Sequence, residues 1–445
     1  MNTRELALRI LIEMEQKDSQ SHRLLQDTWK KYPELTDQDR RFILRLVQGT
    51  LEKRMLLDAR INRKSKVTVN KMKPMIRQLL RMSAYQIFFM DKVPDGAVCN
   101  EAVKLVVKFK MQGLKGFVNG VLRAMAREEH WPEESPLIMY SMPEWIYRSW
   151  ETAYGEETAL CMMQASDEKH RLYFRILGGA GNPEGVSEEM IRDSLDQCHV
   201  VYHPAAFPAG AWIMENPEQL ESLEALKRGW IQIQDISSML VGVLSGVKEN
   251  MQILDVCAAP GGKTLHMAEK LKGTGGIISC DLTDAKVALI RENIERSGWK
   301  NIEAVRQDAR RFHPVWENRM DLVLADLPCS GLGVLGRKPE IRYRTSMEDI
   351  RSLAALQREI LQNVSRYVKP GGRLVFSTCT VTSEENAQNR NWILEHLPFD
   401  AADLPLEELP EAMRGRAAGG QIQLLPGIDP CDGFYISVFR KRMDG

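Results

Sequence analysis

Apolar residues recur at helical spacing through the first part of the chain. Leu6, Ile10 and Met14 form one such series, which repeats in later segments without an alternating strand pattern between them. Thr36 precedes two aspartates and a further apolar series, an arrangement typical of a helix start. The spacing therefore predicts an all-helical domain over residues 1–135.

A mixed pattern follows. Three prolines within 131–145 indicate a link between domains. Residues 171–176 alternate as a strand does, 187–198 have the spacing of a helix, and 229–234 alternate again. Residues 143–234 are thus expected to form a small α+β bridging module.

From residue 235 onward, short apolar runs alternate with helical segments. Such runs are typical of strands buried on both faces of a parallel sheet. They lie at 253–256, 277–281, 302–306, 320–325 and 373–377. Two final strands, at 422–424 and 433–440, are expected to add an antiparallel strand near the end of the sheet. The pattern predicts a doubly wound, Rossmann-like α/β domain over 235–445.

The first of these strands leads into a glycine turn. The segment "ILDVCAAPGGK" passes from strand to turn at Pro260, Gly261 and Gly262, and a helical pattern follows. Glycines allow a backbone to approach a ligand closely, and a helix start offers free N–H groups. The spacing differs from the G-x-G-x-x-G fingerprint of dinucleotide-binding proteins, so the turn by itself is weak evidence for a nucleotide site.

Acidic residues stand at or just after three strand ends. Asp281, Asp308 and Asp326 occupy these positions, and ligands of such sheets bind at the carboxyl ends of the strands. We expect Asp281 to accept hydrogen bonds from ribose hydroxyls and Asp308 to face an adenine amino group. A single acid of this kind is more often a loop cap, but three favour a ligand that carries a ribose.

The eight cysteines include no C-x-x-C pair, which argues against a zinc site and a disulfide framework. Cys329 and Cys379 each follow a predicted strand, at the edge where a ligand would bind. No apolar run approaches the length of a membrane span, and the N-terminus does not read as a signal peptide. We expect a cytoplasmic, monomeric protein without a metal.

The net charge of zero conceals an asymmetry. Residues 1–140 carry 26 Lys and Arg against 17 Asp and Glu, whereas the remainder carries 34 against 43. Within 40–81 the basic residues number 13 and the acidic residues 2. A stripe of this kind is able to hold a phosphate backbone, although a solvated helix face explains the charge equally well.

Two family resemblances favour the RNA-binding interpretation of the basic stripe. The segments "DRRFILRLVQGTLEKRMLLD", "VPDGAVCNEAVKLVVKF" and "GFVNGVLRAM" resemble the NusB family of helical RNA-binding domains over roughly 3–130. The motifs "DVCAAPGGK", "DLPCSG", "STCT" and "LLPGIDPCDGFYIS" resemble the NOL1/NOP2/Sun family of RNA cytosine-C5 methyltransferases. Cys431 departs slightly from the family's ending and is treated as incidental. Together the resemblances imply S-adenosylmethionine-dependent methylation of a specific cytosine in small-subunit (16S) ribosomal RNA.

Carried over by position, the second resemblance implies that Cys379 is the nucleophile that adds to carbon-6 and that Cys329 assists product release. Lys263 is a candidate cation for lowering a thiol pKa, and Asp326 would contact either the base or the cofactor. The residues that would hold S-adenosylmethionine, or lie beside it, are Cys257, Ala258, Ala259, Pro260, Gly261, Gly262, Lys263, Asp281, Asp308 and Asp326.

Two other functions compete with this one. A DNA cytosine methyltransferase would use the Pro-Cys thiol, here Cys329, as its nucleophile, but "STCT" and the NusB-like segment argue against that family. An RNA-binding scaffold without enzymatic activity would need only the basic helical domain. The pair of cysteines and the full glycine turn argue against the scaffold.

Overall fold

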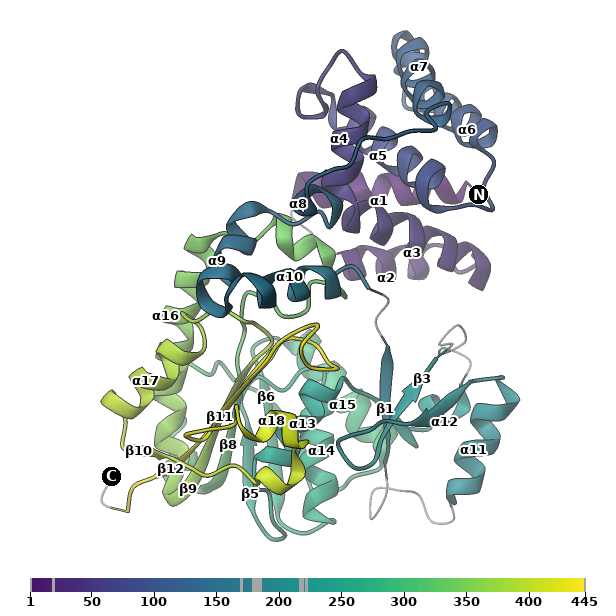
Figure 1. Cartoon of the computed structure of the whole chain (residues 1–445). Helices are drawn as coiled ribbons and strands as arrows, with labels where there is room; N and C mark the ends of the chain where they lie inside the picture. Colours follow the sequence, from purple (N-terminus) through teal and green to yellow (C-terminus); the bar gives the residue numbers. More distant parts are fainter. Residues whose placement is uncertain are drawn as a thin grey trace. The chain divides into compact units, whose positions relative to one another are not determined.

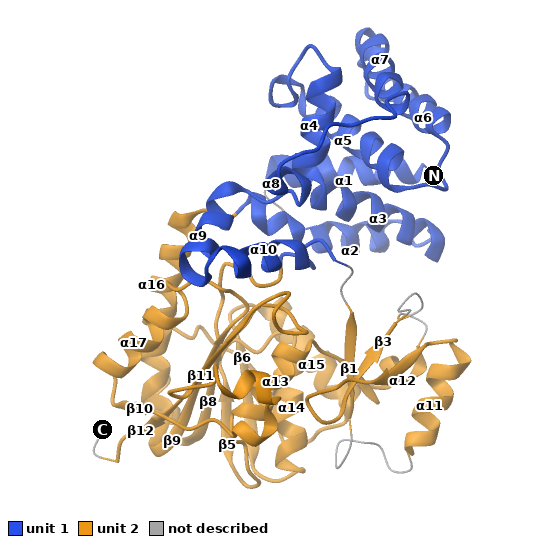
Figure 2. Ribbon diagram, in the orientation of Figure 1, with its two compact units in different colours: residues 1–168, 335–344 blue, residues 169–334, 345–445 orange. Residues whose placement is uncertain are grey.

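The computed structural model describes residues 2–17, 21–168, 171–177, 186–215, 220 and 223–443. The chain divides into two compact units (Figures 1 and 2). Unit 1 comprises 1–168 and 335–344, and unit 2 comprises 169–334 and 345–445. The multidomain architecture predicted from the sequence is confirmed, and each unit is described by itself.

Unit 1 is helical throughout its described residues, as predicted. Thr36 caps α3 in a capping box with Asp39, the start signal that the sequence contains. The helices are α1 (Thr3–Lys17), α2 (Ser21–Lys31), α3 (Asp37–Glu52), α4 (Arg54–Lys64), α5 (Pro74–Phe89), α6 (Asp95–Lys108), α7 (Lys115–Ala126), α8 (Pro136–Met139), α9 (Glu144–Tyr154) and α10 (Glu156–Ala165).

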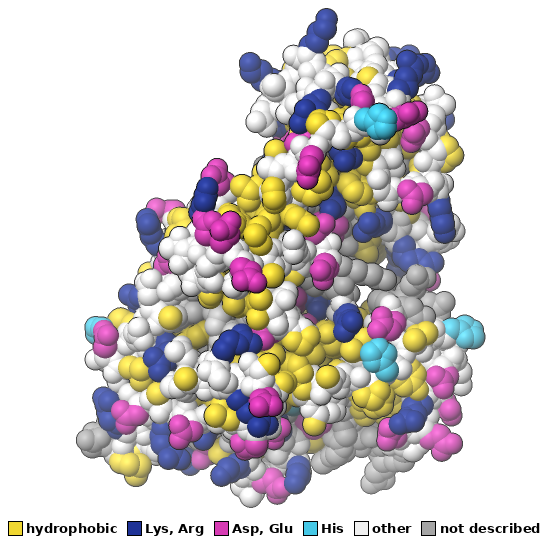
Figure 3. Space-filling view, in the orientation of Figure 1, with side chains coloured by type: hydrophobic (Ala, Val, Ile, Leu, Met, Phe, Trp, Pro, Cys, Tyr) yellow, Lys and Arg dark blue, Asp and Glu magenta, His cyan; other side chains and the backbone are white. Residues whose placement is uncertain are grey.

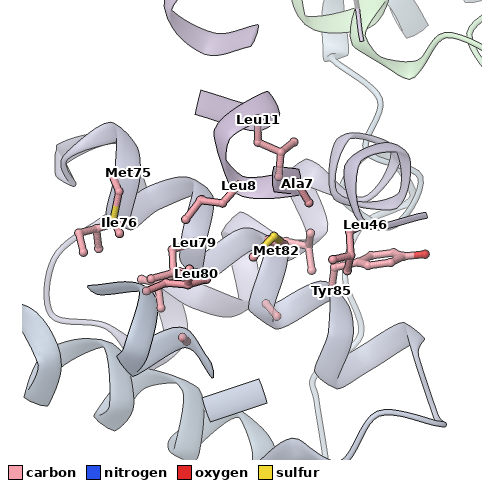
Figure 4. Packing of buried hydrophobic residues seen from close by; sticks show 14 of the residues in the cluster. Ala7, Leu8, Leu11, Leu46, Met75, Ile76, Leu79, Leu80, Met82 and Tyr85 are labelled. Carbon is pink, nitrogen blue, oxygen red and sulfur yellow. The ribbon is translucent and has the colours of Figure 1, made fainter. Parts of the chain in front are cut away.

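Helix α5 is the central element of this unit and packs against α1, α3, α4, α6 and α7. It is buried on most of its circumference, as expected of an inner helix. Figure 4 shows Leu79 and Leu80 of α5 among Leu8 of α1 and Leu46 of α3, all four fully buried. Burying a leucine side chain stabilises the fold by about 1.5–3 kcal/mol.

A short segment from the C-terminal half of the sequence completes unit 1. Residues 335–344 contain a 3-10 helix, η5 (Pro339–Tyr343). The buried Glu340 carboxylate accepts a hydrogen bond from the Ser21 hydroxyl at 2.7 Å. The buried Arg342 guanidinium donates to the Tyr140 carbonyl at 2.9 Å, and the Arg54 guanidinium lies 4.6 Å from the ring centre of Tyr343.

The basic stripe of unit 1 contains both paired and exposed side chains. Arg63 forms an ion pair with Glu134, and Arg60 lies over the Phe88 ring at 4.3 Å. Lys66, Lys71 and Lys73 are exposed in the connection between α4 and α5. Figure 3 shows Lys and Arg side chains spread over the end of unit 1 where α4, α6 and α7 lie.

Unit 2 contains two sheets. The smaller has the order β2-β3-β1-β4, and its neighbouring strands are antiparallel. Its strands are β1 (Leu172–Ile176), β2 (Tyr202–Pro204), β3 (Ala211–Met214) and β4 (Ile231–Ile233), with helices α11 (Glu188–Gln197) and α12 (Glu224–Lys227). The sequence pattern indicated β1, α11 and β4 but not the short strands β2 and β3. Helices α9 and α10, expected in the bridging module, are grouped with unit 1. The division at 1–135, 143–234 and 235–445 stays a prediction.

The larger sheet has the order β10-β12-β9-β8-β5-β6-β7, with β11 paired to β12. Strands β7, β6, β5, β8 and β9 are mutually parallel, and β12 runs antiparallel to β9, as the sequence predicted. The strands are β5 (Gln252–Asp255), β6 (Gly276–Asp281), β7 (Ile302–Arg306), β8 (Met320–Asp326), β9 (Val368–Thr378), β10 (Phe399–Ala401), β11 (Gln421–Leu424) and β12 (Phe434–Lys441).

Helices cover both faces of this sheet (Figure 1). Ile253 of β5 packs in a cluster with residues of α13 and α14, and the next residue, Leu254, packs in a second cluster with residues of α16 and α17. Strand side chains alternate between the two faces, so a strand buried on both sides must be apolar throughout. The helices are α13 (Ile236–Leu244), α14 (Gly262–Leu271), α15 (Asp284–Ser297), α16 (Met347–Val364), α17 (Ala387–His396) and α18 (Glu411–Arg414).

The described residues contain neither a membrane-spanning helix nor a group of metal-binding side chains. Among them, no helix combines the length and apolarity needed to cross a membrane. Among the same residues, no three His, Cys, Asp or Glu side chains gather in a group that could hold a metal ion.

Candidate active site

The glycine turn between β5 and α14 is held by backbone and side-chain hydrogen bonds. The Ala258 amide donates to the Cys280 carbonyl at 2.8 Å, and the Ala259 amide donates to the Asp281 carboxylate at 3.1 Å. Gly261, which precedes α14, has a φ of 109°, a conformation that favours glycine. The turn is therefore fixed against β6, and its helix start faces the carboxyl edge of the sheet.

A pocket of about 180 Å³ opens beside this turn, at the carboxyl ends of β5 and β8. It brings together Lys263 and Asp326, as the sequence predicted, but Gly261, Asp281 and Asp308 are not among its lining residues. The lining residues are Gln232, Ile233, Gln234, Asp235, Ser238, Asp255, Cys257, Ala258, Ala259, Pro260, Gly262, Lys263 and Asp326.

The three predicted acids have different surroundings. Asp326 accepts a hydrogen bond from the Lys263 ammonium at 2.7 Å. The buried Asp281 accepts from the Ala259 and Leu282 amides and forms an ion pair with Lys286. Asp308 pairs with Arg310, and the hydrogen bonds from Arg310 hold the pKa of this carboxyl below its usual value. The roles of Asp281 and Asp308 toward ribose and adenine stay predictions.

The two predicted thiols lie together. Cys329 follows β8 and Cys379 follows β9, which are adjacent parallel strands paired through Asp326 and Ser377. The two sulfur atoms are 3.3 Å apart, neither cysteine forms a disulfide bond, and both are half-buried. The hydrogen bond with Cys379, together with burial, raises the pKa of the Cys329 thiol well above its usual value. Cys329 is therefore held in its protonated thiol form.

Backbone hydrogen bonds join the loop that follows Cys329 to Cys379 and to the segment around Gly433. The Gly333 amide donates to the Cys379 carbonyl at 3.1 Å, and the Gly433 amide donates to the Gly333 carbonyl at 2.8 Å. A Cβ added at Gly333 would lie 2.0 Å from the Gly433 carbonyl oxygen, so this contact requires glycine. The Gly433 position belongs to the "DPCDGFYIS" ending that resembles the methyltransferase family.

The buried carboxylate of Glu385 holds the loop that carries Cys329 through hydrogen bonds. Glu385 is fully buried and accepts hydrogen bonds from the Ser330 amide at 2.8 Å, the Ser330 hydroxyl at 2.6 Å and the Thr382 hydroxyl at 2.7 Å. Gln357 of α16 donates to the Pro328 carbonyl at 2.9 Å. Sequence reasoning missed Glu385 and Gln357, because neither stands at a strand end and only the folded chain brings them to this loop.

Lys263 interacts electrostatically with both Asp326 and Cys379. Burial lowers the pKa of its ammonium, but the charge and hydrogen bond of Asp326, with a smaller contribution from Cys379, leave the pKa above its usual value. The ammonium also lies 5.2 Å from the ring centre of Phe434. Lys263 therefore stays charged and is able to favour a thiolate nearby.

Asp255 is a site residue that the sequence analysis overlooked. It is the last residue of β5, six residues before Gly261, and is 1 % exposed. Burial raises the pKa of Asp255 to about 7. The strand-end rule that selected Asp281, Asp308 and Asp326 applies to Asp255 as well, so the signal was present in the sequence.

Comparisons with known proteins identify the families that the two parts of the chain match. Residues 242–440 match the model of the 16S rRNA methyltransferase RsmB/F family, and residues 1–127 match the model of the NusB family. The chain is 36% identical to a probable ribosomal RNA small subunit methyltransferase B of Bacillus subtilis (strain 168), with 99% of each chain covered. It is 30% identical to a protein with the same description from Synechocystis sp., over 99% of this chain and 100% of that one.

Solved structures are similar to the fold of the whole chain and of its catalytic part. The crystal structure of PH0851 aligns with a TM-score of 0.82 and 23% identity over 99% of both chains. The structure of NSun6 from Pyrococcus horikoshii with SFG aligns with a TM-score of 0.59 and 20% identity, over 67% of this chain and 98% of that one. From the family models and the full-length relatives, we conclude that the chain belongs to the family of ribosomal RNA small subunit methyltransferases B, enzymes that methylate 16S ribosomal RNA.

Proposed function

We propose that this 16S rRNA methyltransferase modifies carbon-5 of a cytosine through a covalent adduct between Cys379 and carbon-6 of the base. The observation that supports the proposal most directly is the 3.3 Å separation of the Cys329 and Cys379 sulfurs at adjacent strand ends. Carbon-5 of cytosine is a poor nucleophile, and a thiolate that adds to carbon-6 makes carbon-5 electron-rich. Two thiols side by side suit a reaction that must both form and release such an adduct.

The Cys379 thiolate forms a carbon–sulfur bond at carbon-6, and the electrons of the carbon-5 to carbon-6 double bond move toward carbon-5. Carbon-5 then takes the methyl group from the sulfonium sulfur of S-adenosylmethionine, and the bond between that sulfur and the methyl carbon breaks so that S-adenosylhomocysteine leaves. Water accepts the proton of carbon-5, the electrons of that carbon–hydrogen bond restore the double bond, and the carbon–sulfur bond breaks to return the Cys379 thiolate. Cys329 is assigned to this release phase, because its sulfur is adjacent to the nucleophile.

Lys263 is assigned to the nucleophile Cys379, and Asp326 is assigned to the cytosine ring. The Lys263 ammonium stabilises the Cys379 thiolate by its charge. Asp326 has one carboxylate oxygen bonded to Lys263 and the other to the Ser377 hydroxyl at 2.7 Å, so its position is fixed. In this position it is suited to accept a hydrogen bond from the amino edge of a cytosine that has been turned out of the RNA stack.

The methyl donor is S-adenosylmethionine, which supplies a methyl group bound to a sulfonium sulfur. The pocket at β5 fits such a ligand, because buried polar atoms of Gln232, Gln234 and Asp255 face it without a hydrogen-bond partner. The turn from Cys257 to Lys263 and the acids Asp281, Asp308 and Asp326 are the proposed donor-binding residues.

For Asp281→Ala, we expect binding of the methyl donor to weaken by about 1.5–3 kcal/mol, the cost of losing charge-assisted hydrogen bonds. The reason is the proposed contact with the ribose hydroxyls, together with the loss of the hydrogen bond that holds Ala259. Isothermal titration calorimetry measures the change. Asp284→Ala is the matched control, because Asp284 is an exposed acid at the start of the next helix. Unchanged affinity in a folded Asp281→Ala protein would refute the role.

The second prediction concerns the basic stripe, whose role in holding RNA phosphates is proposed. Replacing the exposed Lys66, Lys71 and Lys73 by Glu should weaken RNA binding and reduce the slope of log affinity against log salt by about 2. Filter binding of 16S rRNA fragments over a salt series gives the slope. Binding of the methyl donor should not change. A wild-type slope would mean that these lysines only face solvent.

Bisulfite mapping of 16S rRNA tests the proposed reaction as a whole. RNA from cells lacking the protein is incubated with the purified protein and the methyl donor. We expect one cytosine to become resistant to bisulfite conversion and to stay unmodified in RNA that was not incubated. Methylation of the RNA without any resistant cytosine would overturn the assignment to carbon-5.

A further inference from the structure

Hydrogen bonds connect Glu385 to the residues that follow both thiols. Glu385 is fully buried, and its Oε2 accepts a hydrogen bond from the hydroxyl of Ser330, the residue after Cys329, at 2.6 Å. The same Ser330 hydroxyl lies 2.7 Å from the hydroxyl of Thr380, the residue after Cys379. Because Ser330 gives its proton to Glu385, Thr380 is the donor in the second bond. One carboxylate therefore orients a chain of hydroxyls that joins the two thiol motifs.

The Glu385 carboxylate is bonded to neutral donors. They are the Ser330 amide at 2.8 Å, the Ser330 hydroxyl, the Thr382 hydroxyl at 2.7 Å and the Gln357 side-chain amide at 3.2 Å. Each of these groups has a hydrogen to give, so the carboxylate satisfies them in its ionised form. Among the described residues, no Lys, Arg or His pairs with it. A buried charge that is hydrogen-bonded but not neutralised acts on groups several ångströms away.

The two thiols are subject to charges of opposite sign. The Lys263 ammonium, which donates to Asp326 at 2.7 Å, interacts electrostatically with Cys379. Cys379 and Glu385 are the titratable groups with the strongest influence on Cys329. The hydrogen bond with Cys379 raises the pKa of the Cys329 thiol most, and burial and the charge of Glu385 raise it further. A cation that acts on one sulfur and an anion that acts on the other favour a thiolate at Cys379 and a thiol at Cys329.

We propose that Glu385 is a positioning residue that assigns different roles to the two thiols. Its hydrogen bonds hold Ser330 and Thr380 together, and its negative charge keeps Cys329 in the thiol form while Cys379 becomes the thiolate. The assignment rests on the proposed roles of the two cysteines. It accounts for the use of only one of two adjacent thiols as the nucleophile.

Glu385→Gln removes the charge and keeps the hydrogen bonds. Oε1 accepts from N–H groups of Ser330 and Gln357, whereas Oε2 accepts from the hydroxyls of Ser330 and Thr382. A glutamine with its oxygen at the first position and its NH₂ group at the second satisfies all four, because a hydroxyl is also able to accept a hydrogen bond. Glu384→Gln is the matched control, since Glu384 is the preceding residue and is partly exposed.

Alkylation of Cys329 by iodoacetamide, followed against pH in the full-length protein, measures the effect of the charge. Cys379→Ala is the background, because the hydrogen bond with Cys379 is otherwise the largest cause of the raised pKa of Cys329. Peptide mass spectrometry gives the initial rate at each cysteine. Adding Glu385→Gln should lower the midpoint of the Cys329 profile by about one pH unit and raise the rate below the midpoint about tenfold, as expected on removing one buried charge. Adding Glu384→Gln should leave the midpoint unchanged.

The pH profile distinguishes a charge effect from a loosened loop. A loosened loop would react faster by the same factor at every pH, and an unchanged midpoint in the folded Glu385→Gln protein overturns the proposal. If that protein does not fold, the wild type decides: Cys379 must have the lower midpoint, and a lower midpoint at Cys329 overturns the proposal.

Alkylation requires neither RNA nor the methyl donor, so its result is independent of the proposed reaction. A shifted midpoint in a protein that methylates no carbon-5 would overturn the covalent mechanism and support the effect of Glu385 on the thiols. An unchanged midpoint in a protein that does methylate carbon-5 would overturn the role of Glu385 alone.

Discussion

A Cys379→Ala variant will not methylate 16S rRNA and will form no covalent protein–RNA adduct, because no thiolate remains to add to carbon-6. The Cys329→Ala variant will behave differently, although its sulfur lies only 3.3 Å from that of Cys379 in the wild type. It should attack and methylate the base and then stall, because release of the adduct is impaired. The stalled species is a protein–RNA conjugate that survives denaturing electrophoresis.

The two variants also separate this enzyme from a DNA-type mechanism. If Cys329 were the nucleophile, the pattern would invert and the conjugate would accumulate in Cys379→Ala. If both variants stay active and neither retains RNA, both thiols are structural and the proposed mechanism is wrong. Cys198→Ala is the matched control, since Cys198 ends α11 and belongs to neither thiol motif. It should methylate at the wild-type rate without a conjugate.

Raising the pH from about 4 to 7 should destabilise the fold through Asp255 alone by about 4 kcal/mol. The pKa of Asp255 is raised from 3.8 to about 7 by burial, and each unit corresponds to about 1.4 kcal/mol. Over this interval the unfolded chain has released the proton and the folded chain still holds it, so stability falls as pH rises. The charges that face Asp255 are Asp326 and Lys263, and they act in opposite directions on its pKa.

Asp255→Asn isolates this effect. The amide stays neutral at every pH and keeps an oxygen for the Thr264 hydroxyl. Urea unfolding at several pH values gives the free energy of unfolding for both proteins. The difference between them should favour the variant increasingly from pH 4 to pH 7 and level off above it. Parallel curves for the two proteins would show that Asp255 is ionised throughout.

The fold and the thiol pair follow from rules that apply to local sequence. Alternation of apolar runs with helical spacing predicts the parallel sheet, and the carboxyl ends of adjacent strands in such a sheet meet at one edge. The sequence therefore predicts that Cys329 and Cys379 lie near each other, and their sulfurs do lie together. The glycine turn and Lys263 follow from the same rule.

Other features depend on contacts that no local pattern encodes. The sequence predicted a strand at 229–234, but it did not show that Gln232 and Gln234 would face a pocket. Glu385 supports the Cys329 loop through hydrogen bonds that form only when α16 and the two thiol loops are in place. The short strands β2 and β3 were missed because three or four residues carry too little periodicity to be recognised.

The segment 335–344 determines how this protein can be divided. A fragment that begins at residue 169 keeps Glu340 and Arg342, whose hydrogen-bond partners Ser21, Tyr140 and Ser141 it lacks. Two charged side chains that are buried in the intact chain would then lose these hydrogen-bond partners. Exchanging the helical part for that of a relative therefore requires three junctions, one near residue 168 and two that bracket 335–344. A single fusion point would leave residues 335–344, which belong to unit 1, on the other side of the junction.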